Sequence, residues 1–544
     1  MCGICGVVAK VGTSDTAGLV LRMLQEMSHR GPDSAGIAWD GGSMTAPNLD
    51  DLLAGASTVR APRTLGHARL RITGGDRGRQ PFVDRARRLS LVFNGEIYNY
   101  RELARRFGGP RTDTDGEVLF HLLGGAHEKD GMDAVHRILP DLDGVYAFAM
   151  MDSEAVILAR DRVGVKQVYF GENDRLVAFA SERKALWRIG MRSHRLDPGR
   201  TLRMSSCGVI LGHGRPLPVL PVAYTDRVKA KAVYRRVVME AVRKRVEGHG
   251  KVGVLFSGGV DSVLIARLAA GLCNEVIAYA GGVPGSPDLT LAMKAARSIG
   301  IPIRVRELDA GTIEKLVPET VAAIEDGDLL QVEAAIPMYA ALGLAREDGV
   351  RVMLTGQGAD ELFAGYEWYP PILYEEGEQA LLACQWSDLT NLYRDTLERE
   401  DKMSMAHSIE LRVPFLDPAV IAEAMRISPR LNIDTAEGAH DPLRKRLHRE
   451  LALDLGVPRS IAMRLKDGVQ HGSGIHRALE AIARRHAPLA PCAVLDLDDS
   501  EQRGSAFRHA GFDVRGGAYG SEEARAYVNA AALAVFEPVV GRAG

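Results

Sequence analysis

Two cysteines stand at the start of the chain, in the sequence MCGICGVVAK. The Cys2-x-x-Cys5 spacing is that of half a zinc site or of a redox dithiol. No second cysteine pair and no His-x3-His motif follow nearby, so neither use is favoured. Removal of Met1 would give Cys2 a free α-amine, which titrates at about 7.7–8.0 and can act as the base for its own thiol. Cys5, three residues further along an expected strand, should face the opposite side.

A glycine- and serine-rich loop follows a buried-strand pattern in the middle of the chain, in the sequence GVLFSGGVDS at residues 253–262. Its two glycines allow positive φ angles and let a phosphate approach the backbone. The helix expected after the loop directs its N–H groups at an anion, and two serine hydroxyls add donors. The loop lacks the Lys-Ser/Thr ending of a Walker loop. It predicts a phosphate site of another kind, and the alternative is a plain strand–helix turn capped by Asp261.

A second loop at a strand end lies in the sequence VRVMLTGQGADELF at residues 350–363. Ligands of open α/β sheets bind beyond the carboxyl ends of the strands, where Asp261 and Asp360 are both expected. Mg²⁺ is usually held by one or two carboxylates together with substrate phosphates. The two aspartates are therefore candidate Mg²⁺ ligands, and the alternative for Asp360 is a simple helix cap.

The elements that must hold these residues differ between the two halves of the chain. The first half has short apolar or alternating runs bounded by Gly, Asp or Asn, with helical patterns between them. This predicts layered α/β structure with mainly antiparallel sheets. The expected strands are residues 6–9, 89–93, 144–150, 156–159 and 176–180, and the expected helices are residues 17–27 and 115–123.

A proline-rich stretch, RPLPVLP at residues 215–221, is an expected linker rather than a long internal loop. After it strands and helices alternate, which predicts a doubly wound parallel sheet. From about residue 368 the pattern is mainly helical, and residues 490–504 have no clear pattern. The expected strands are residues 251–256, 275–280, 301–308 and 350–354, and the expected helices are residues 262–272, 288–300 and 336–347.

Composition and charge exclude several classes of protein. The 544 residues suffice for two or three domains, and a net charge of -2 gives no basic bias toward nucleic acid or a membrane surface. No apolar run reaches the roughly 18 residues of a membrane span, and the N-terminus lacks the basic region of a signal peptide. Six thinly spread cysteines suit a reducing compartment. We expect a cytoplasmic protein with no nucleic-acid or membrane partner.

Taken together, the motifs resemble those of the glutamine-hydrolysing asparagine synthetase family. Residues 401–417, DKMSMAHSIELRVPFLD, closely resemble its C-terminal signature, and RLKD at residues 464–467 resembles its Arg-x-Lys segment. SGGVDS at residues 257–262 resembles the pyrophosphate-binding loop of ATP pyrophosphatases. FNGEIYN at residues 93–99 resembles a segment of class II glutamine amidotransferases, as does SHRGPDSAG at residues 28–36. The resemblance spans roughly residues 2–480, in the family's order.

The resemblance implies a fold and a reaction. Residues 2–214 would form a four-layer αββα N-terminal-nucleophile domain with antiparallel sheets, and residues 215–228 a linker. Residues 229–544 would form a doubly wound parallel-sheet α/β synthetase domain with a helical C-terminal part. Glutamine hydrolysis at Cys2 would supply NH3 through a channel, and ATP would activate aspartate as β-aspartyl-AMP with release of pyrophosphate. Glutamine, aspartate and ATP with Mg²⁺ are the implied ligands, and a homodimer is compatible with the sequence.

The resemblance also implies roles for individual residues. Asn94 and Gly95 would form the oxyanion hole beside Cys2, and Lys466 would face the phosphates and the developing negative charge. The implied glutamine ligands are Arg69, Ile72, Asn94, Glu96 and Asp115. The implied ATP contacts are Leu255, Ser257, Gly258, Gly259, Asp261, Ser262, Gly356 and Gln357. The implied aspartate ligands are Lys402, Glu410 and Arg412.

Taken singly, several of these residues have plainer explanations. Arg69 and Lys466 could be surface residues, the Asn-Gly pair could be a hairpin turn, and Glu410 with Arg412 could be a structural ion pair. The joint order of the first-half motifs behind an N-terminal cysteine favours a glutaminase site.

One loop departs from the family pattern, because GQGAD at residues 356–360 stands where the family has Gly-Glu-Gly-Ser-Asp. Gln357 keeps hydrogen-bonding capacity but cannot take up a proton.

The sequence as a whole leaves three hypotheses for the function: asparagine synthesis, amide formation on a different carboxylate, or a non-catalytic homologue. The retained Cys2, Asn94, Ser257, Asp261 and Lys466 argue against the third.

Overall fold

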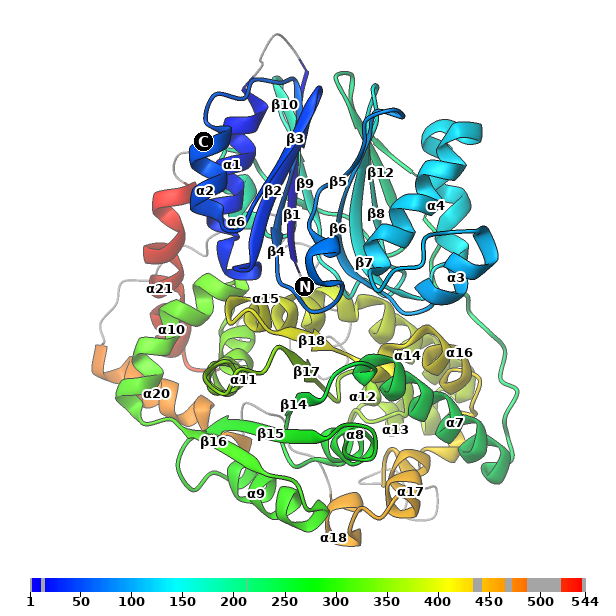
Figure 1. The fold of residues 1–544 in the computed structure, drawn as a ribbon. Helices are drawn as coiled ribbons and strands as arrows, with labels where there is room; N and C mark the ends of the chain where they lie inside the picture. The colour runs from blue at the N-terminus through cyan, green and yellow to red at the C-terminus, as the bar shows by residue number, and fades with distance from the viewer. Residues whose placement is uncertain are drawn as a thin grey trace. The chain divides into compact units, whose positions relative to one another are not determined.

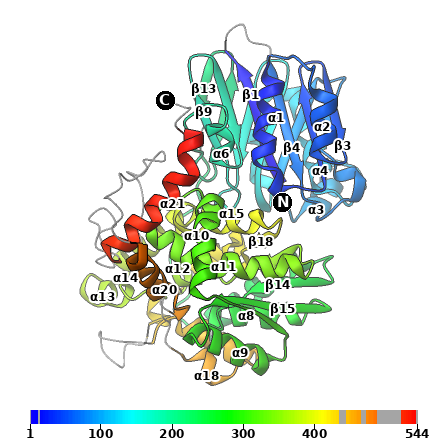
Figure 2. The same ribbon diagram turned by 90° about the vertical axis from the view of Figure 1, so that its left-hand side faces the viewer.

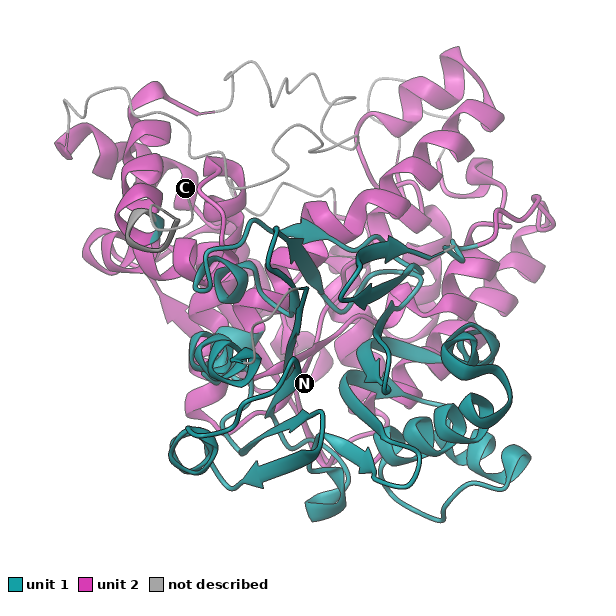
Figure 3. Cartoon of the chain, turned by 90° about the horizontal axis from the view of Figure 1, so that it is seen from above, with its two compact units in different colours: residues 1–217, 405–408, 536–544 teal, residues 218–404, 409–535 magenta. Residues whose placement is uncertain are grey.

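The computed structural model describes residues 2–10, 15–212, 214–433, 443–464, 472–486 and 520–540, with side chains as far as Phe536 in the last range. The chain divides into two compact units (Figure 3). Unit 1 comprises residues 1–217, 405–408 and 536–544, and unit 2 comprises residues 218–404 and 409–535. The chain first leaves unit 1 between Leu217 and Pro218, inside the proline-rich stretch, and later returns two short segments to it.

Unit 1 contains a seven-stranded antiparallel sheet in the order β11-β9-β10-β1-β4-β2-β3 (Figure 1). Strand β1 lies inside this sheet, between β4 and β10. Helix α1 lies over the face formed by β1 and β4 (Figure 2). The strands are β1 (Cys2–Ala9), β2 (Ser34–Trp39), β3 (Gly42–Ala46), β4 (Arg63–Arg69), β9 (Tyr169–Glu172), β10 (Leu176–Ala180) and β11 (His194–Arg195), and the helices on this side are α1 (Thr16–Glu26), α2 (Leu49–Ala56) and α6 (Arg183–Trp187).

A second sheet of unit 1 has six strands in the order β13-β12-β8-β7-β6-β5, again all antiparallel. Its outer face is covered by a second group of helices (Figure 1). The strands are β5 (Phe82–Asp84), β6 (Leu89–Ile97), β7 (Gly144–Met151), β8 (Val156–Arg160), β12 (Thr201–Ser205) and β13 (Gly208–Leu211), and the helices are α3 (Tyr100–Phe107), α4 (Asp115–Asp130) and α5 (Ala134–Ile138).

Strand β1 shows how the layers are held together, because its side chains alternate between two apolar cores. Cys5 and Val7 pack with the residues of α1 and α2, whereas Ile4 and Val8 pack with Val92 of the second sheet. All eight residues of β1 are buried, since both faces of the strand are covered. A third core lies between the second sheet and α4. The expected four-layer αββα domain is confirmed.

Unit 2 is built on a five-stranded sheet in the order β16-β15-β14-β17-β18, in which every pair is parallel. Helices α8 and α9 cover one face and α11 covers the other (Figures 1 and 2). The expected doubly wound sheet is confirmed, and its strand order reverses between β14 and β17. The elements are β14 (Lys251–Leu255), α8 (Val260–Ala270), β15 (Glu275–Gly282), α9 (Pro287–Ile299), β16 (Ile303–Glu307), α10 (Ala310–Ile324), α11 (Leu329–Glu347), β17 (Val352–Leu354) and β18 (Glu410–Arg412).

The structure differs from the sequence-based prediction in several places: among others, β2, β3, β4, α2 and α10 had no predicted counterpart. Helix α11 begins two turns before the predicted start, because the Asp328 side chain caps it by accepting a hydrogen bond from the Gln331 N–H. The region expected to be mainly helical also supplies strand β18. Its three residues have no strand pattern in the sequence, but they pair with β17. The remaining helices are α7 (Arg227–Val246), α12 (Ala359–Leu362), α13 (Tyr369–Glu375), α14 (Glu378–Leu392), α15 (Glu398–Ala406), α16 (Pro418–Ala424), α17 (Arg446–Asp454), α18 (Arg459–Ala462), α20 (Ile475–His486) and α21 (Glu522–Val540).

A search of the helices in the described ranges finds none with the length and apolar character that a membrane crossing requires. Residues 490–504, which have no clear pattern in the sequence, lie outside the described residues.

Candidate active sites

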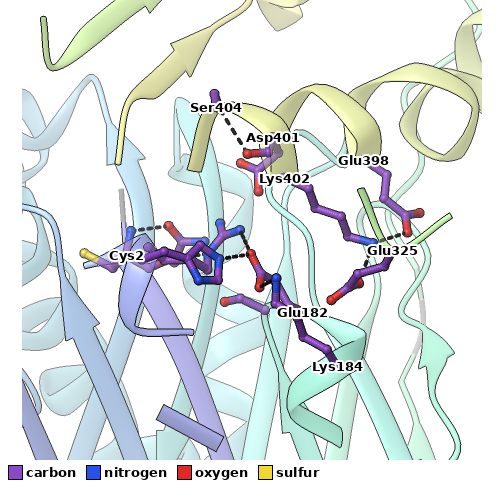
Figure 4. A network of polar contacts seen from close by, with 12 residues as sticks. Cys2, Glu182, Lys184, Glu325, Glu398, Asp401, Lys402 and Ser404 are labelled. Atoms are coloured by element: carbon purple, nitrogen blue, oxygen red, sulfur yellow. Dashed lines mark hydrogen bonds and ion pairs between the residues drawn. The ribbon is translucent and has the colours of Figure 1, made fainter. Parts of the chain in front are cut away.

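Cys2 lies at the start of β1, directly opposite Arg69 of the neighbouring strand β4. It is 8% exposed, so the residue is largely buried. Its backbone N–H donates a hydrogen bond to Asn94 Oδ1 of the second sheet across 2.9 Å (Figure 4). The two sheets of unit 1 therefore bring the predicted nucleophile and the predicted oxyanion-hole residue together.

Asn94 and Gly95 have the properties that an oxyanion hole needs. The Asn94 side chain is fully buried, and its Nδ2 has no hydrogen-bond partner among the described residues, so an N–H donor is available beside Cys2. Gly95 has φ 156°, and a Cβ there would lie 2.2 Å from the Val145 carbonyl oxygen, so only glycine fits. The preceding Phe93 is held at both backbone groups by the Gln80 side chain, at 2.6 and 3.1 Å. This preorganises the donor.

The predicted glutamine ligands lie around the same ends of the strands. Arg69 is 5% exposed, and its Nη2 donates to the Thr73 carbonyl across 3.1 Å. Burial lowers the pKa of Arg69. Asp115 begins α4 and accepts a hydrogen bond from the Ile97 N–H at 2.9 Å, which places its carboxylate next to Glu96.

Ile72, the remaining predicted glutamine ligand, has an apolar environment. It packs in a small cluster with Leu70 and Met405. Its neighbour Arg71 donates its backbone N–H to the Asp33 carboxylate at 2.7 Å, which ties this loop to the segment after the first helix. Such an apolar wall fits the methylene groups of a glutamine side chain.

A buried ion cluster lies behind Cys2. The Arg30 guanidinium donates Nε to the Cys2 carbonyl oxygen at 3.2 Å and Nη1 to Glu182 at 2.9 Å. Glu182 also contacts His29 at 3.0 Å and Lys184 at 2.9 Å (Figure 4). Burial alone would raise the pKa of Glu182, but His29, Lys184 and Arg30 hold it well below its ordinary value. The cluster holds the backbone of Cys2, the predicted nucleophile, through its carbonyl oxygen.

Glu182 was not predicted from the sequence, and Arg30 was included only in a matched segment. The sequence does contain a signal for Glu182, because it stands two residues after the apolar run of β10. A charged side chain so close to a buried strand is expected to be buried only if it has a partner of opposite charge.

In unit 2, the predicted phosphate loop lies between β14 and α8. Gly258 has φ 73°, and a Cβ there would lie 2.7 Å from the Ala292 backbone, so the loop is tightly turned against α9. The Ser257 and Ser262 hydroxyls lie 3.4 Å apart, with Ser262 at the first turn of α8. The arrangement matches an anion cradle in which hydroxyls and helix N–H groups face one point.

The second predicted loop lies against the first. A Cβ on Gly356 would approach the Asp261 backbone to 2.9 Å, so glycine is required for the contact between the loops. Gly358 has φ 96° and directly precedes α12. Asp360 is the second residue of that helix. Leu255 ends β14, and Gln357 lies half-buried in the loop after β17. Both loops occupy the topological switch point, where such folds bind ligands.

Asp261 and Asp360 converge on one cation, the Lys445 ammonium. Lys445 Nζ lies 2.8 Å from Asp261 Oδ2 and 2.7 Å from Asp360 Oδ1. Two carboxylates aimed at one point beside a phosphate loop fit Mg²⁺ that is shared with phosphate oxygens. Within the described ranges, no group of three or more His, Cys, Asp or Glu side chains could hold a metal ion by itself.

Asp261 is also contacted from its other side. His448 Nε2 lies 3.1 Å from Asp261 Oδ1, and the Tyr234 hydroxyl lies 2.7 Å from His448 Nδ1. Sequence reasoning missed Tyr234, Lys445 and His448. They come from α7, from the residue before α17 and from α17, and no motif marks them.

The predicted aspartate ligands are all buried and paired. Lys402 lies 2.7 Å from Glu325 and 2.8 Å from Glu398 (Figure 4). Arg412 Nε donates to Glu410 at 2.7 Å, so the structural ion pair considered above is present, and aspartate binding stays a prediction.

Lys466, the predicted phosphate-facing lysine, lies outside the described residues. Arg464, two residues before Lys466, is described. The backbone carbonyl of Arg464 accepts a hydrogen bond from Arg449 Nη1 at 2.7 Å.

An N-terminal-nucleophile fold with Cys2 at its site, joined to a parallel α/β fold with a phosphate loop, defines a glutamine amidotransferase fused to a nucleotide-binding synthetase. Family models agree: asparagine synthase matches residues 233–383 and 374–491, and the glutamine amidotransferase domain matches residues 55–208. The chain belongs to the glutamine-hydrolysing asparagine synthetase family, which confirms the resemblance seen in the sequence.

The similarity to individual proteins extends over nearly the whole chain. A Methanocaldococcus jannaschii protein that carries the name of an asparagine synthetase [glutamine-hydrolyzing] is 34% identical, over 89% of this chain and 96% of its own. Asparagine synthetase B [glutamine-hydrolyzing] of Escherichia coli is 29% identical, over 87% and 83%. The glutamine phosphoribosylpyrophosphate amidotransferase of B. subtilis, a solved structure, aligns at 20% identity with a TM-score of 0.36, over 56% of this chain and 65% of its own.

Proposed function

We propose that this chain makes asparagine from aspartate, with glutamine as the nitrogen donor and ATP as the activating substrate. The observation that carries the proposal is the hydrogen bond from the Cys2 N–H to Asn94 Oδ1. This bond leaves the Asn94 NH2 group available at the predicted oxyanion position. Membership of the glutamine-hydrolysing family supports the same reaction.

The glutaminase step follows from the groups around Cys2. After loss of Met1, the α-amine takes the thiol proton and the thiolate attacks the glutamine amide carbon. Asn94 Nδ2 and the Gly95 N–H stabilise the oxyanion, and Arg69 holds the α-carboxylate of glutamine. Collapse of the tetrahedral intermediate releases NH3 and leaves a thioester, which water hydrolyses to glutamate.

The synthetase step uses the loops of unit 2. The loop of residues 257–262 holds the ATP phosphates, and Mg²⁺, when bound by Asp261 and Asp360, neutralises phosphate charge. A carboxylate oxygen of aspartate attacks the α-phosphorus and pyrophosphate leaves, with Lys466 facing the developing charge. NH3, channelled from the glutaminase, displaces AMP from β-aspartyl-AMP. We place these steps in the cytoplasm, which the free thiols of the described cysteines support.

A second candidate is amide formation on a different carboxylate. Gln357 favours it, because a glutamine at this loop position cannot take up the proton that a glutamate could. A variant Gln357→Glu would test the point: faster aspartate turnover in the variant would mark Gln357 as an adaptation to another acceptor.

The deciding experiment incubates the protein with glutamine, ATP, Mg²⁺ and a panel of carboxylates, and measures glutamate, pyrophosphate and amide. Asparagine formation supports the proposal. Pyrophosphate release only with another acceptor supports the second candidate, and no turnover of any substrate contradicts both. Cys2→Ala should abolish glutamine-dependent synthesis and retain ammonia-dependent synthesis.

A further inference from the structure

Asp261 is held on both of its carboxylate oxygens. Oδ2 lies 2.8 Å from Lys445 Nζ, the point that it shares with Asp360, and Oδ1 lies 3.1 Å from His448 Nε2. A carboxylate held at only one oxygen can rotate about its Cβ–Cγ bond. Contact at Oδ1 therefore decides where Oδ2 points.

The His448 ring lies between Tyr234 and Asp261 and contacts each through a different nitrogen. Nδ1 lies 2.7 Å from the Tyr234 hydroxyl, and Nε2 lies 3.1 Å from Asp261 Oδ1. Burial raises the pKa of the Tyr234 hydroxyl, which therefore stays protonated beside the ring. The ring thus links the Tyr234 hydroxyl to one oxygen of the Asp261 carboxylate.

The His448 ring is also held by aromatic packing. It is fully buried on α17. Its ring centroid lies 5.3 Å from that of Phe363, at an interplanar angle of 29°, and 5.4 Å from that of Phe415, at 66°. Phe363 follows α12 directly, so the ring packs against the same short segment that carries Asp360. A ring fixed in this way can orient its neighbour without moving.

We propose that His448, supported by Tyr234, is a positioning residue that orients the Asp261 carboxylate so that its Oδ2 converges with Asp360 on the cation of the nucleotide site. The proposal rests on the proposed function, because it assigns Mg²⁺ with ATP phosphates to that cation position. Groups that orient metal-binding side chains in this way typically change metal affinity by about 10–100-fold when removed.

The test compares Mn²⁺ binding by the wild-type protein, His448→Leu, His448→Gln and Tyr234→Phe, with a non-hydrolysable ATP analogue present and electron paramagnetic resonance as the readout. His448→Leu should weaken Mn²⁺ binding about 10–100-fold. His448→Gln keeps an N–H donor and should recover part of the affinity. Tyr234→Phe removes only the far hydroxyl and should have a smaller effect. When pyrophosphate release is measured with ammonia as the nitrogen source, KM for Mg²⁺ should rise most in His448→Leu and less in His448→Gln and Tyr234→Phe.

Circular dichroism and denaturant unfolding report whether unit 2, which contains Tyr234 and His448, is folded in each variant. If His448→Leu is folded and binds Mn²⁺ as tightly as the wild type, the positioning role is refuted. If the wild type itself binds no Mn²⁺ with the analogue, the proposed nucleotide site is refuted instead. If His448→Leu does not fold, the graded comparison of His448→Gln with Tyr234→Phe decides, and equal wild-type affinity in both refutes the role.

Discussion

The Asn94 side chain contacts Cys2 through its oxygen alone: Oδ1 accepts the Cys2 N–H across 2.9 Å, while the buried Nδ2 has no partner among the described residues. One amide thus anchors the nucleophile and keeps a donor for the substrate. An unmade hydrogen bond in a buried site carries a free-energy cost that a bound oxyanion would remove.

Replacement of Asn94 should therefore act on the rate of glutamine hydrolysis. Asn94→Ala should lower kcat by about 10²–10³-fold, because one oxyanion donor is lost. Asn94→Asp keeps the acceptor for the Cys2 N–H and should lower kcat at least as much, since its charge opposes the oxyanion. Glutamate release measures kcat, and ammonia-dependent synthesis should persist.

Asn99 provides a matched control in the same segment. Its side chain bonds the backbone of Asp141 at 2.8 Å and of Asp143 at 3.0 Å, with no contact to Cys2. Asn99→Ala should change stability more than kcat. Equal loss of kcat in Asn99→Ala and Asn94→Ala would argue against the oxyanion role.

The second prediction concerns the ion cluster behind Cys2. Glu182→Gln leaves the buried Arg30 without its countercharge, and should lower the free energy of unfolding by about 3–5 kcal/mol. Because the folded pKa of Glu182 is depressed, this contribution is full above the ordinary value of 4.5 and is lost as pH falls through the folded pKa. Denaturant unfolding at pH 7 and at acidic pH measures it.

An exposed pair gives the comparison for Glu182. Glu128→Gln breaks the ion pair with Arg87 at 2.6 Å on the surface and should cost at most about 1 kcal/mol. If Glu182→Gln costs no more than Glu128→Gln at pH 7, the cluster does not stabilise unit 1.

The third prediction is a pH dependence of unit 2. Glu400 is 2% exposed on α15, and burial raises its pKa to about 7, with Arg399 opposing. Between its ordinary pKa of 4.5 and about 7 the folded protein holds a proton that the unfolded chain releases, so stability falls as pH rises. Glu400→Gln should remove this slope and stabilise the protein at pH 8 by up to about 3 kcal/mol.

Thermal unfolding of both proteins at pH 5 and pH 8 checks the effect of Glu400. The wild type should lose melting temperature between these pH values, and the variant should lose less. A parallel loss in both proteins would mean that Glu400 is ionised in the folded state.

The fourth prediction concerns Lys445 as a competitor for the metal. Its ammonium occupies the point between Asp261 and Asp360, so Lys445→Met should tighten Mn²⁺ binding in the absence of nucleotide by about tenfold or more. Lys251→Met, at the opposite end of β14, removes a lysine that lies 3.7 Å from Glu275 and should leave this affinity unchanged. Unchanged binding in Lys445→Met would exclude competition at the two aspartates.

The sequence indicated both sites because their chemistry is carried by contiguous residues at strand ends. Gly258 and Gly95 are needed for backbone conformations that few other residues adopt, so the motifs around them are conspicuous. Strong alternation and apolar runs also predicted the central strands of both units. Strand β18 was missed because three residues carry no periodicity, and only pairing with β17 makes them a strand.

Only the tertiary structure decided the partners of these residues. Lys445 and His448 are separated from Asp261 by more than 180 positions, and neither belongs to a recognisable pattern. Glu182 likewise meets Arg30 from 152 positions away. A lone buried lysine, histidine or glutamate has no local signal, because the partner that offsets its desolvation comes from another segment of the chain. The sequence determined which residues could react, and the fold determined which groups hold them in place.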